Sequence, residues 1–520
     1  MHFHQAIQRN SVVLSNVIGT SFGDRERTWS DIKTRVAKLA SALVAKGANK
    51  ETHIAILALN SDRYFEILNA ISWAGSVMVP LNTRWSTKEN LYSLNNSLSS
   101  VLFVDDAFLE EGKTLMSQSE NIDYIIYMGE QEPPQGMLSY EALINESKPI
   151  KPVYSGYDDM VGIFYTGGTT GFPKGVMLSH KNLWTSSICL ISAMEINQQG
   201  ERYLHAAPMF HLADIGISYG TVISGLTQVF IPSFTPDAVI ETIANKKVNH
   251  VLLVPTMVTL LLSSPALNKA DLSSLKNIVY GASPMPEGTL ISAMEKMPSV
   301  NFIQAYGQSE LSPLISILPA AYHVVEGDKS GKLRSAGQPG YCVNVEIRDE
   351  QGNALPCGEV GEIAAMGPNV MLGYWKNEDQ TQSTIIDGWV LTGDAGYIDE
   401  GGFIFLVDRV KDMIVTGGEN VFSAEVENTL SLHPQILESI VIGIPCEQWG
   451  ESVHAIIRLH EGADVSTEDI ISFCKEQIAH YKAPRSIEFR IEPFPMTGAG
   501  KYKKNELRAP YWKEKTRAIN

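Results

Sequence analysis

A stretch rich in glycine and threonine at residues 165–175, YTGGTTGFPKG, has the composition of a loop that binds a polyphosphate. Glycines let backbone N–H groups turn toward an anion, threonine hydroxyls add donors, and Lys174 supplies a positive charge. The stretch is not a Walker loop, because Pro173 stands where that motif needs the glycine before its lysine. A plain surface turn is the alternative interpretation. The candidate phosphate ligands are Thr166, Gly167, Gly168, Thr169, Thr170, Gly171 and Lys174.

The overall composition narrows the class of protein and of partner. The chain has 520 residues, of which 44% are hydrophobic and 19% charged, so we expect two or more globular domains with ample core. Its formal net charge of −17, from 41 basic and 58 acidic residues, argues against a nucleic-acid binder but still permits a local site for an anion. The first residues, MHFHQ, lack the order of a secretory signal, and the apolar run at 248–262 is too interrupted to span a bilayer.

The cysteines favour a reducing compartment. They are odd in number and scattered, and no two have the spacing of a metal or redox motif. We therefore expect free thiols and a cytoplasmic location. The five residues are Cys189, Cys342, Cys357, Cys446 and Cys474.

The elements that would position the loop alternate between strand and helix patterns. An amphipathic segment from Trp29 to Lys46 predicts a helix, the apolar run at 53–59 predicts a buried strand, and residues 129–158 predict a surface crossing. Further helices are predicted to begin at Ser61, Ser86, Ser179 or His180, Asp237 and Val258. Further strands are predicted at 77–80, 101–104, 124–127, 203–207, 229–231 and 250–254. This alternation indicates an α/β fold with a parallel sheet.

The pattern changes from about Gly337 onward. Short apolar segments with close turns predict a smaller antiparallel unit, with strands at 343–347, 361–365 and 403–406. Mixed patterns follow, in which Ser423 is predicted to cap a helix through Leu432, residues 440–444 form a strand, and a helix runs from Ser466 to His480. We therefore divide the chain into an N-terminal domain at 1–410 and a C-terminal domain at 411–520.

Several further stretches occur in an order that resembles the adenylate-forming superfamily of acyl- and aryl-CoA synthetases, luciferases and peptide-synthetase adenylation domains. They are GASP at 281–284, QAYGQSE at 304–310, LTGDAG at 391–396, DRVKD at 408–412 and PMTGAGK at 495–501. Each is modest alone, but their joint order is specific, and the resemblance covers about residues 25–510. It implies a large N-terminal domain of stacked α/β subdomains with a small antiparallel β unit. A small mobile α+β C-terminal domain would turn on a hinge at Lys411.

The resemblance also assigns roles at a nucleotide site. Glu310, with Thr169, would hold Mg²⁺, which prefers oxygen ligands, and Asp394 would accept hydrogen bonds from the ribose hydroxyls. The other implied ATP-binding residues are Gly281, Ala282, Ser283, Gln304, Tyr306, Gly307, Gln308, Ser309, Arg409 and Lys501. The implied catalytic residues are Lys501, Glu310, His211 and Thr166. This chain has Ser309 where threonine is usual, and Gly167 where serine or threonine is frequent.

The acid and thiol sites follow from the same resemblance. In PMFHLAD at 208–214, His211 would gate the acid and the thiol, and Glu419 would orient His211. The implied acyl pocket contains His211, Asp214, Ile215, Ala282, Gln308 and Leu314. The implied CoA-binding residues are Gly417, Gly418, Glu419, Trp449, Tyr481, Lys482 and Arg485. The mostly apolar pocket favours a fatty or aryl acid over an amino acid, which would need a carboxylate for its ammonium group.

The implied activity is an AMP-forming acid–CoA ligase that uses ATP, Mg²⁺ and CoA. Medium- or long-chain fatty acids are the expected substrates, with aryl or phenylpropenoid acids as the alternative. A stand-alone enzyme that loads a carrier protein is a second alternative, and the motifs alone do not separate a luciferase-type oxygenase. A non-enzymatic relative would have lost Lys501, Glu310 or Asp394, and all three are present. A lipid substrate would allow peripheral contact with a membrane. Assembly as a homodimer is a further open alternative.

Overall fold

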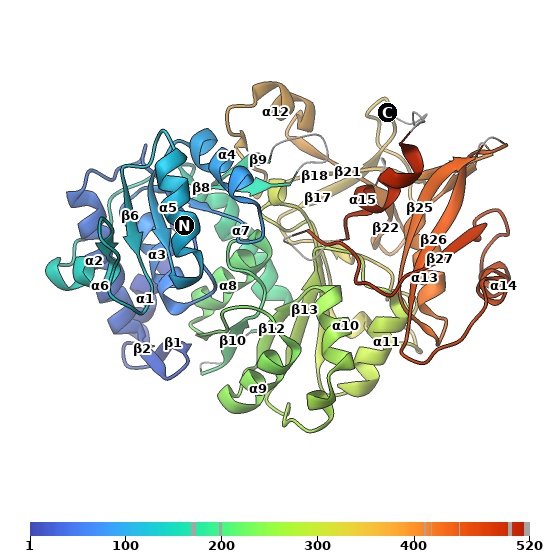
Figure 1. Cartoon of the computed structure of the whole chain (residues 1–520), viewed down its shortest axis with the longest axis horizontal. Coiled ribbons are helices and arrows are strands. Elements are labelled where there is room, and N and C mark those ends of the chain that lie inside the picture. Colours follow the sequence, from blue (N-terminus) through green and yellow to red (C-terminus); the bar gives the residue numbers. More distant parts are fainter. Residues whose placement is uncertain are drawn as a thin grey trace.

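The computed structural model describes residues 1–167, 173–196, 200–409, 412–417, 419–446, 448–497 and 502–513, without the side chains of Asp408, Arg409 and Asn420. In this part of the chain the strands form four sheets (Figure 1). Sheet B and its helices lie at one end, sheet D lies at the other, and sheets A and C lie between them.

Sheet A is mostly parallel and has the order β16-β15-β14-β13-β12-β10-β11-β1-β2. Its strands are β1 (Ile18–Phe22), β2 (Arg25–Thr28), β10 (Arg202–His205), β11 (Thr227–Phe230), β12 (His250–Leu253), β13 (Asn277–Gly281), β14 (Asn301–Tyr306), β15 (Ser316–Leu318) and β16 (Gln338–Pro339). Sheet B has the order β19-β9-β8-β4-β3-β5-β6-β7 and is parallel from β8 to β7. Its strands are β3 (His53–Leu57), β4 (Val77–Pro80), β5 (Ser99–Val104), β6 (Tyr124–Tyr127), β7 (Leu138–Ser139), β8 (Met160–Thr166), β9 (Lys174–Ser179) and β19 (Gly373–Tyr374).

Sheets C and D are smaller. Sheet C is antiparallel, with β17 (Asn344–Arg348), β18 (Gly361–Met366), β20 (Ile385–Ile386), β21 (Trp389–Ile398) and β22 (Ile404–Arg409). Sheet D contains β23 (Ile414–Thr416), β24 (Glu419–Val421), β25 (Ile436–Cys446), β26 (Gly450–Leu459) and β27 (Ser486–Phe489). The predicted α/β class and its small antiparallel unit are thus confirmed, whereas the predicted domain boundary at residues 410 and 411 lies outside the described residues.

Helices cover both faces of sheets A and B. The helices of the chain are α1 (Gln5–Val13), α2 (Trp29–Ala45), α3 (Asp62–Trp73), α4 (Thr87–Ser97), α5 (Leu109–Gln118), α6 (Tyr140–Glu146), α7 (His180–Ala193), α8 (Leu212–Ser224), α9 (Pro236–Lys246), α10 (Pro255–Ser263), α11 (Glu287–Lys296), α12 (Glu378–Thr384), α13 (Ser423–Ser431), α14 (Thr467–Gln477) and α15 (Lys504–Arg508). Helices α7 and α8 lie between sheets A and B, because their apolar residues join core clusters with strands of both. Among the described helices, none is long and apolar enough to cross a membrane.

Local sequence signals account for several helix starts. The side chain of Ser61 caps α3, and Ser86 and Glu89 form the predicted capping box of α4. Ser179 caps α7 in the same way. These caps satisfy backbone N–H groups that have no partner inside the helix. The start of each helix is therefore determined by a few neighbouring residues in the sequence.

Two predictions on local structure were wrong. Residues 129–158 contain β7 and α6, and Tyr140 of α6 is fully buried with its hydroxyl on the Glu66 carboxylate. This buried tyrosine ties the segment to the core, a contact that the polar sequence around it hides. Ser423 does not cap α13: Phe422 is the capping residue, and the Ser423 hydroxyl instead accepts a hydrogen bond from Lys504 at 2.5 Å.

The cysteines carry no disulfide, as predicted. However, Cys189 on α7 and Cys342, 153 residues apart, bring their Sγ atoms within 2.8 Å. This contact holds the pKa of Cys189 at about 7, below its ordinary value, because the neighbouring thiol donates a hydrogen bond to the thiolate.

Candidate active site

Two of the predicted nucleotide motifs leave neighbouring parallel strands at one edge of sheet A. β13 ends at Gly281, β14 ends at Tyr306, and Gly281 lies opposite Ala305 in their register. A Cβ added to Gly281 would lie 2.1 Å from the backbone oxygen of Ala305, so this approach requires glycine. Ala282 follows with φ +68°, a left-handed conformation that is uncommon for alanine. The carboxyl edge of a parallel sheet is where α/β folds bind ligands, so both motifs stand at such an edge.

Tyr306 and Asp394 join the second of these motifs, at the end of β14, to sheet C. The Tyr306 hydroxyl donates to Asp394 Oδ2 at 2.8 Å. The backbone N–H of Asp394 donates to the hydroxyl of Thr392 at 3.1 Å, and Asp394 faces Arg409 across β21 and β22. The Tyr306 ring, the Asp394 carboxylate and the backbone of Arg409 therefore lie close together. A site for a nucleoside would require such a grouping.

Glu310 lies in a short 3₁₀ turn, Ser309–Leu311, directly after β14. Its Oε1 accepts a hydrogen bond from the Tyr374 hydroxyl at 2.7 Å. Burial and the Glu310 charge raise the pKa of Tyr374 far above its ordinary value, so the phenol keeps its proton and acts as the donor. Among the described residues, only Oε1 of this carboxylate takes a hydrogen bond.

The carboxylate of Glu310 suits Mg²⁺, because hard oxygen donors are what this ion prefers. The described residues contain no cluster of three or more acidic, histidine or cysteine side chains that would hold a metal by themselves. That arrangement fits an ion held by one carboxylate together with substrate phosphates, which is the usual binding of Mg²⁺ at nucleotide sites.

Thr166 and Lys174 frame the glycine-rich loop. They lie opposite each other in the antiparallel register of β8 and β9. Lys174 Nζ donates to Gln380 Oε1 at 3.0 Å and lies 5.5 Å from the centre of the Tyr374 ring. The ends of the loop are therefore fixed on sheet B.

The turn after Tyr306 contains a buried donor that lacks a partner. Gln308 Nε2 is buried and has no hydrogen-bond partner in the described structure. Gly307 allows the turn, since a Cβ there would lie 2.0 Å from the backbone oxygen of Pro313. Gln304, in contrast, accepts a hydrogen bond from the Tyr280 hydroxyl at 3.4 Å. A buried N–H without an acceptor is costly, so Gln308 fits a position where a ligand supplies one.

The predicted acyl-pocket residues differ in how they are used. His211 caps α8, with Nδ1 accepting from the N–H of Ala213 at 3.2 Å, which in the neutral ring leaves the proton on Nε2. Asp214 is fully buried, and its two oxygens accept from the Tyr203 hydroxyl at 2.9 Å and pair with His205 at 2.7 Å. The carboxylate is thus engaged inside the protein. The other members are buried or half-buried among apolar side chains: Ile215, Leu314 and Ala282.

Predicted CoA residues gather on sheet D. The backbone N–H of Gly417 donates to the Trp449 oxygen at 2.8 Å, and a Cβ on Gly417 would lie 2.8 Å from the indole. Arg485 lies over that indole at 4.8 Å, while Lys482 pairs with Glu425 at 2.8 Å. Two further members are exposed: Tyr481 and Glu419. An exposed indole and guanidinium together suit a base and a phosphate.

Comparisons with known proteins identify the family of the chain. Residues 4–375 match the family described as AMP-binding enzyme, and residues 425–501 match the AMP-binding enzyme C-terminal domain. The chain belongs to the AMP-binding enzyme family. It is 35% identical over 493 residues to a feruloyl-CoA synthase of an Amycolatopsis species, with 94% of each protein covered. It is 33% identical over 499 residues to the fatty acid–[acyl-carrier-protein] ligase ScoC of Streptomyces coeruleorubidus, covering 95% of this chain and 94% of that protein.

The fold of this AMP-binding enzyme is shared with solved structures. The amide bond synthetase McbA from Marinactinospora thermotolerans has a TM-score of 0.88 at 27% identity, covering 98% of this chain and 99% of that chain. The predicted superfamily is thereby confirmed, as is the predicted class of enzyme, an AMP-forming acid–thiol ligase. Some predicted site residues of the AMP-binding enzyme lie outside the described part: Gly168, Thr169, Thr170, Gly171, Lys411, Gly418, Lys501 and the side chain of Arg409.

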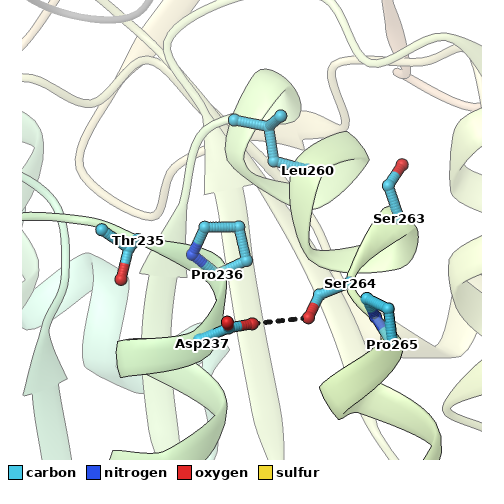
Figure 2. A pocket seen from close by; sticks show the side chains of 7 residues that line it. All are labelled: Thr235, Pro236, Asp237, Leu260, Ser263, Ser264 and Pro265. Carbon is cyan, nitrogen blue, oxygen red and sulfur yellow. Dashed lines mark hydrogen bonds between the residues drawn. The ribbon is translucent and has the colours of Figure 1, made fainter.

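A surface hollow of about 520 Å³ lies away from these motifs, between the start of α9 and the end of α10 (Figure 2). Within it, Ser264 donates to the Asp237 carboxylate at 2.7 Å. Its lining contains none of the predicted site residues: Thr235, Pro236, Asp237, Leu260, Ser263, Ser264 and Pro265.

Sequence reasoning missed Tyr374 and Gln380 of the AMP-binding enzyme. Both contact predicted site residues, Tyr374 through Glu310 and Gln380 through Lys174. Tyr374 stands in an apolar run of the sequence, where a tyrosine is usually a packing residue, and Gln380 lies 206 residues from Lys174. No local spacing could have linked them to the site.

Proposed function

We propose that this AMP-binding enzyme activates an apolar carboxylic acid with ATP and transfers the acyl group to CoA. The observation that carries the proposal is the hydrogen bond between Tyr306 and Asp394, which brings two of the nucleotide motifs together from distant parts of the chain. In the first step a carboxylate oxygen attacks the α-phosphorus of ATP and pyrophosphate leaves. In the second step the CoA sulfur attacks the acyl carbon, giving the thioester and AMP.

The residues of this chain would divide the work of the first step. Asp394 binds the ribose hydroxyls, Tyr306 borders the base, and the loop framed by Thr166 and Lys174 holds the outer phosphates. Lys501 stabilises the charge that grows on the phosphorus oxygens during attack. A general base is not needed, because the acid is already ionised at neutral pH. Mg²⁺ held by Glu310 and Thr169 would neutralise charge on the phosphate oxygens.

The second step would use the face formed by sheet D. Gly417, Trp449 and Arg485 suit the passage and binding of CoA, since glycine leaves room for a thin chain and the indole–guanidinium pair suits a base and phosphates. We propose that the C-terminal domain, residues 411–520, turns about Lys411 so that Lys501 leaves and this face enters.

A medium- or long-chain fatty acid is our first candidate for the substrate. Asp214, the charged member of the acyl pocket, already pairs with His205, so the residues left to meet the acid are mainly apolar. An aryl acid is the second candidate, favoured by the 35% identity to a feruloyl-CoA synthase. A carrier protein in place of CoA is favoured by the likeness to ScoC.

The test is pyrophosphate release measured across fatty acids of increasing length and across aryl acids. Each acid is run with CoA, with a carrier protein and with neither acceptor, and products are identified by mass spectrometry. We expect acid-dependent pyrophosphate release and a CoA thioester. ATP consumption that never yields a CoA thioester would refute the ligase assignment, and a carrier-bound product alone would replace CoA as the acceptor.

A further inference from the structure

Strand β19 and the residues beside it tie two predicted motifs together through the backbone. The N–H of Met371 donates to the backbone oxygen of Glu310 at 2.9 Å. The N–H groups of Leu372 and Trp375 donate to the backbone oxygens of Met177 and Gly175 at 2.9 and 2.8 Å. One short segment therefore links the turn that bears Glu310 to the strand that leaves the glycine-rich loop.

The side chain of Tyr374 also links the two motifs, because it contacts both Glu310 and Lys174. This residue is only 6% exposed, and its hydroxyl donates to Glu310 Oε1. The centre of the ring lies 5.5 Å from Lys174 Nζ, a cation–π distance. The backbone N–H of Tyr374 donates to the Thr381 hydroxyl at 2.9 Å, which anchors the residue to α12.

Helix α12 completes the arrangement on the lysine side. Gln380 accepts from Lys174 Nζ through Oε1, and its Nε2 donates to the Thr384 hydroxyl at 3.3 Å. The amide is therefore oriented with its oxygen toward the lysine. Among the ion pairs of the described residues, Lys174 and Glu310 do not pair with each other, although both contact Tyr374.

We propose that Tyr374 is a positioning residue that fixes the Glu310 carboxylate for a divalent cation and keeps Lys174 apart from it for the phosphates of ATP. This rests on the proposed function in one respect, the role of Glu310 at the metal. A glutamate side chain has three rotatable bonds, so a fixed Oε1 restricts where Oε2 points. The aromatic ring gives Lys174 a neutral neighbour, so the cation stays available to an anionic ligand instead of forming an internal ion pair.

The test is calorimetric binding of ATP over a series of Mg²⁺ concentrations, in the full-length protein without any acid or CoA. Tyr374→Phe removes only the hydroxyl, and we expect the apparent Kd for ATP at low Mg²⁺ to rise about 10-fold, because a hydrogen bond to a charged group is lost. Excess Mg²⁺ should recover most of this loss. In a Glu310→Gln background the same change should alter the Kd by less than about twofold, because the charged acceptor is gone.

Tyr127→Phe is the matched control, since Tyr127 also donates to a carboxylate, that of Asp106, and belongs to the same sheet. It should leave ATP binding unchanged at every Mg²⁺ concentration. Gln380→Leu tests the lysine side separately and should weaken ATP binding without changing its dependence on Mg²⁺.

An unchanged Mg²⁺ dependence in Tyr374→Phe, or an equal loss in the Glu310→Gln background, would overturn the proposal. If Tyr374→Phe does not fold by circular dichroism, normal ATP binding by Gln380→Leu overturns the lysine half of it. Because binding needs no acid, a failure of the proposed ligase activity stays distinguishable from a failure of this inference.

Discussion

Tyr306 and Asp394 are 88 residues apart in the sequence, yet the tyrosine hydroxyl lies 2.8 Å from the aspartate carboxylate. The contact joins the end of β14 in sheet A to β21 in sheet C. It thereby holds the Tyr306 ring and the Asp394 carboxylate, which we propose for the base and the ribose, at a fixed separation.

Tyr306→Phe should weaken ATP binding while leaving the ring in place. The lost hydrogen bond to a charged group is worth about 1.5–3 kcal/mol, so we expect the KM for ATP to rise about 10-fold or more. Acid-dependent pyrophosphate exchange measures this KM. Tyr397→Phe is the control, because Tyr397 lies on the same β21 but stacks on Phe405. A KM for ATP that stays at the wild-type value would mean that the contact does not position Asp394.

Gly167→Ser should strengthen ATP binding. A Cβ added at Gly167 would meet no atom of the described residues within 4 Å, and the Gly167 backbone is not left-handed, so these residues leave room for a side chain. The new hydroxyl would supply a hydrogen-bond donor to a phosphate of ATP. One additional hydrogen bond of about 1 kcal/mol would lower the KM for ATP roughly fivefold. Gly167→Ala adds the Cβ without the hydroxyl and serves as the control. If serine and alanine act alike, or serine raises the KM, the loop does not use a donor at this position.

Arg485→Gln should impair the thioester step alone. The guanidinium stacks on Trp449, away from the nucleotide motifs, so we expect the KM for CoA to rise about 10-fold, because a charge-assisted contact to phosphate is lost. Pyrophosphate exchange in the absence of CoA should not change. Arg490→Gln removes an equal charge from the same sheet region and should have no effect on CoA. An equal loss in both assays would place Arg485 outside the CoA site.

Lys501→Ala and Lys411→Pro should have opposite effects on the two half-reactions. Loss of Lys501 removes a cation from the phosphorus under attack, so adenylation should fall about 100-fold or more while thioester formation from supplied acyl-AMP persists. Proline at 411 would restrict the backbone at the proposed hinge, so adenylation should persist and thioester formation should fall. The two half-reactions are measured separately in each variant. Domain alternation is wrong if each mutation reduces both to the same degree.

Local signals in the sequence determined most elements and the order of the motifs. The amphipathic helix α2, the caps at Ser61 and Ser86, and the small antiparallel sheet C were predictable because capping and periodic burial depend on residues a few positions apart. The motif stretches could also be recognised from the sequence alone. Their glycines had a local reason, which at Gly281 is the close approach of the Ala305 backbone.

Only the tertiary structure decided how the motif residues are held. The contacts of Tyr374 with Glu310, of Asp214 with His205 and of Cys189 with Cys342 have no signature in spacing. Such pairs form only because α7, α8 and sheets A, B and C pack together and bring distant elements into contact. From the residue types alone, Tyr374 would be interpreted as an aromatic residue of the core and Asp214 as a carboxylate that faces the acyl pocket. Burial explains these pairs, because a buried polar group without a partner is costly, and Gln308 Nε2 is an exception among the described residues.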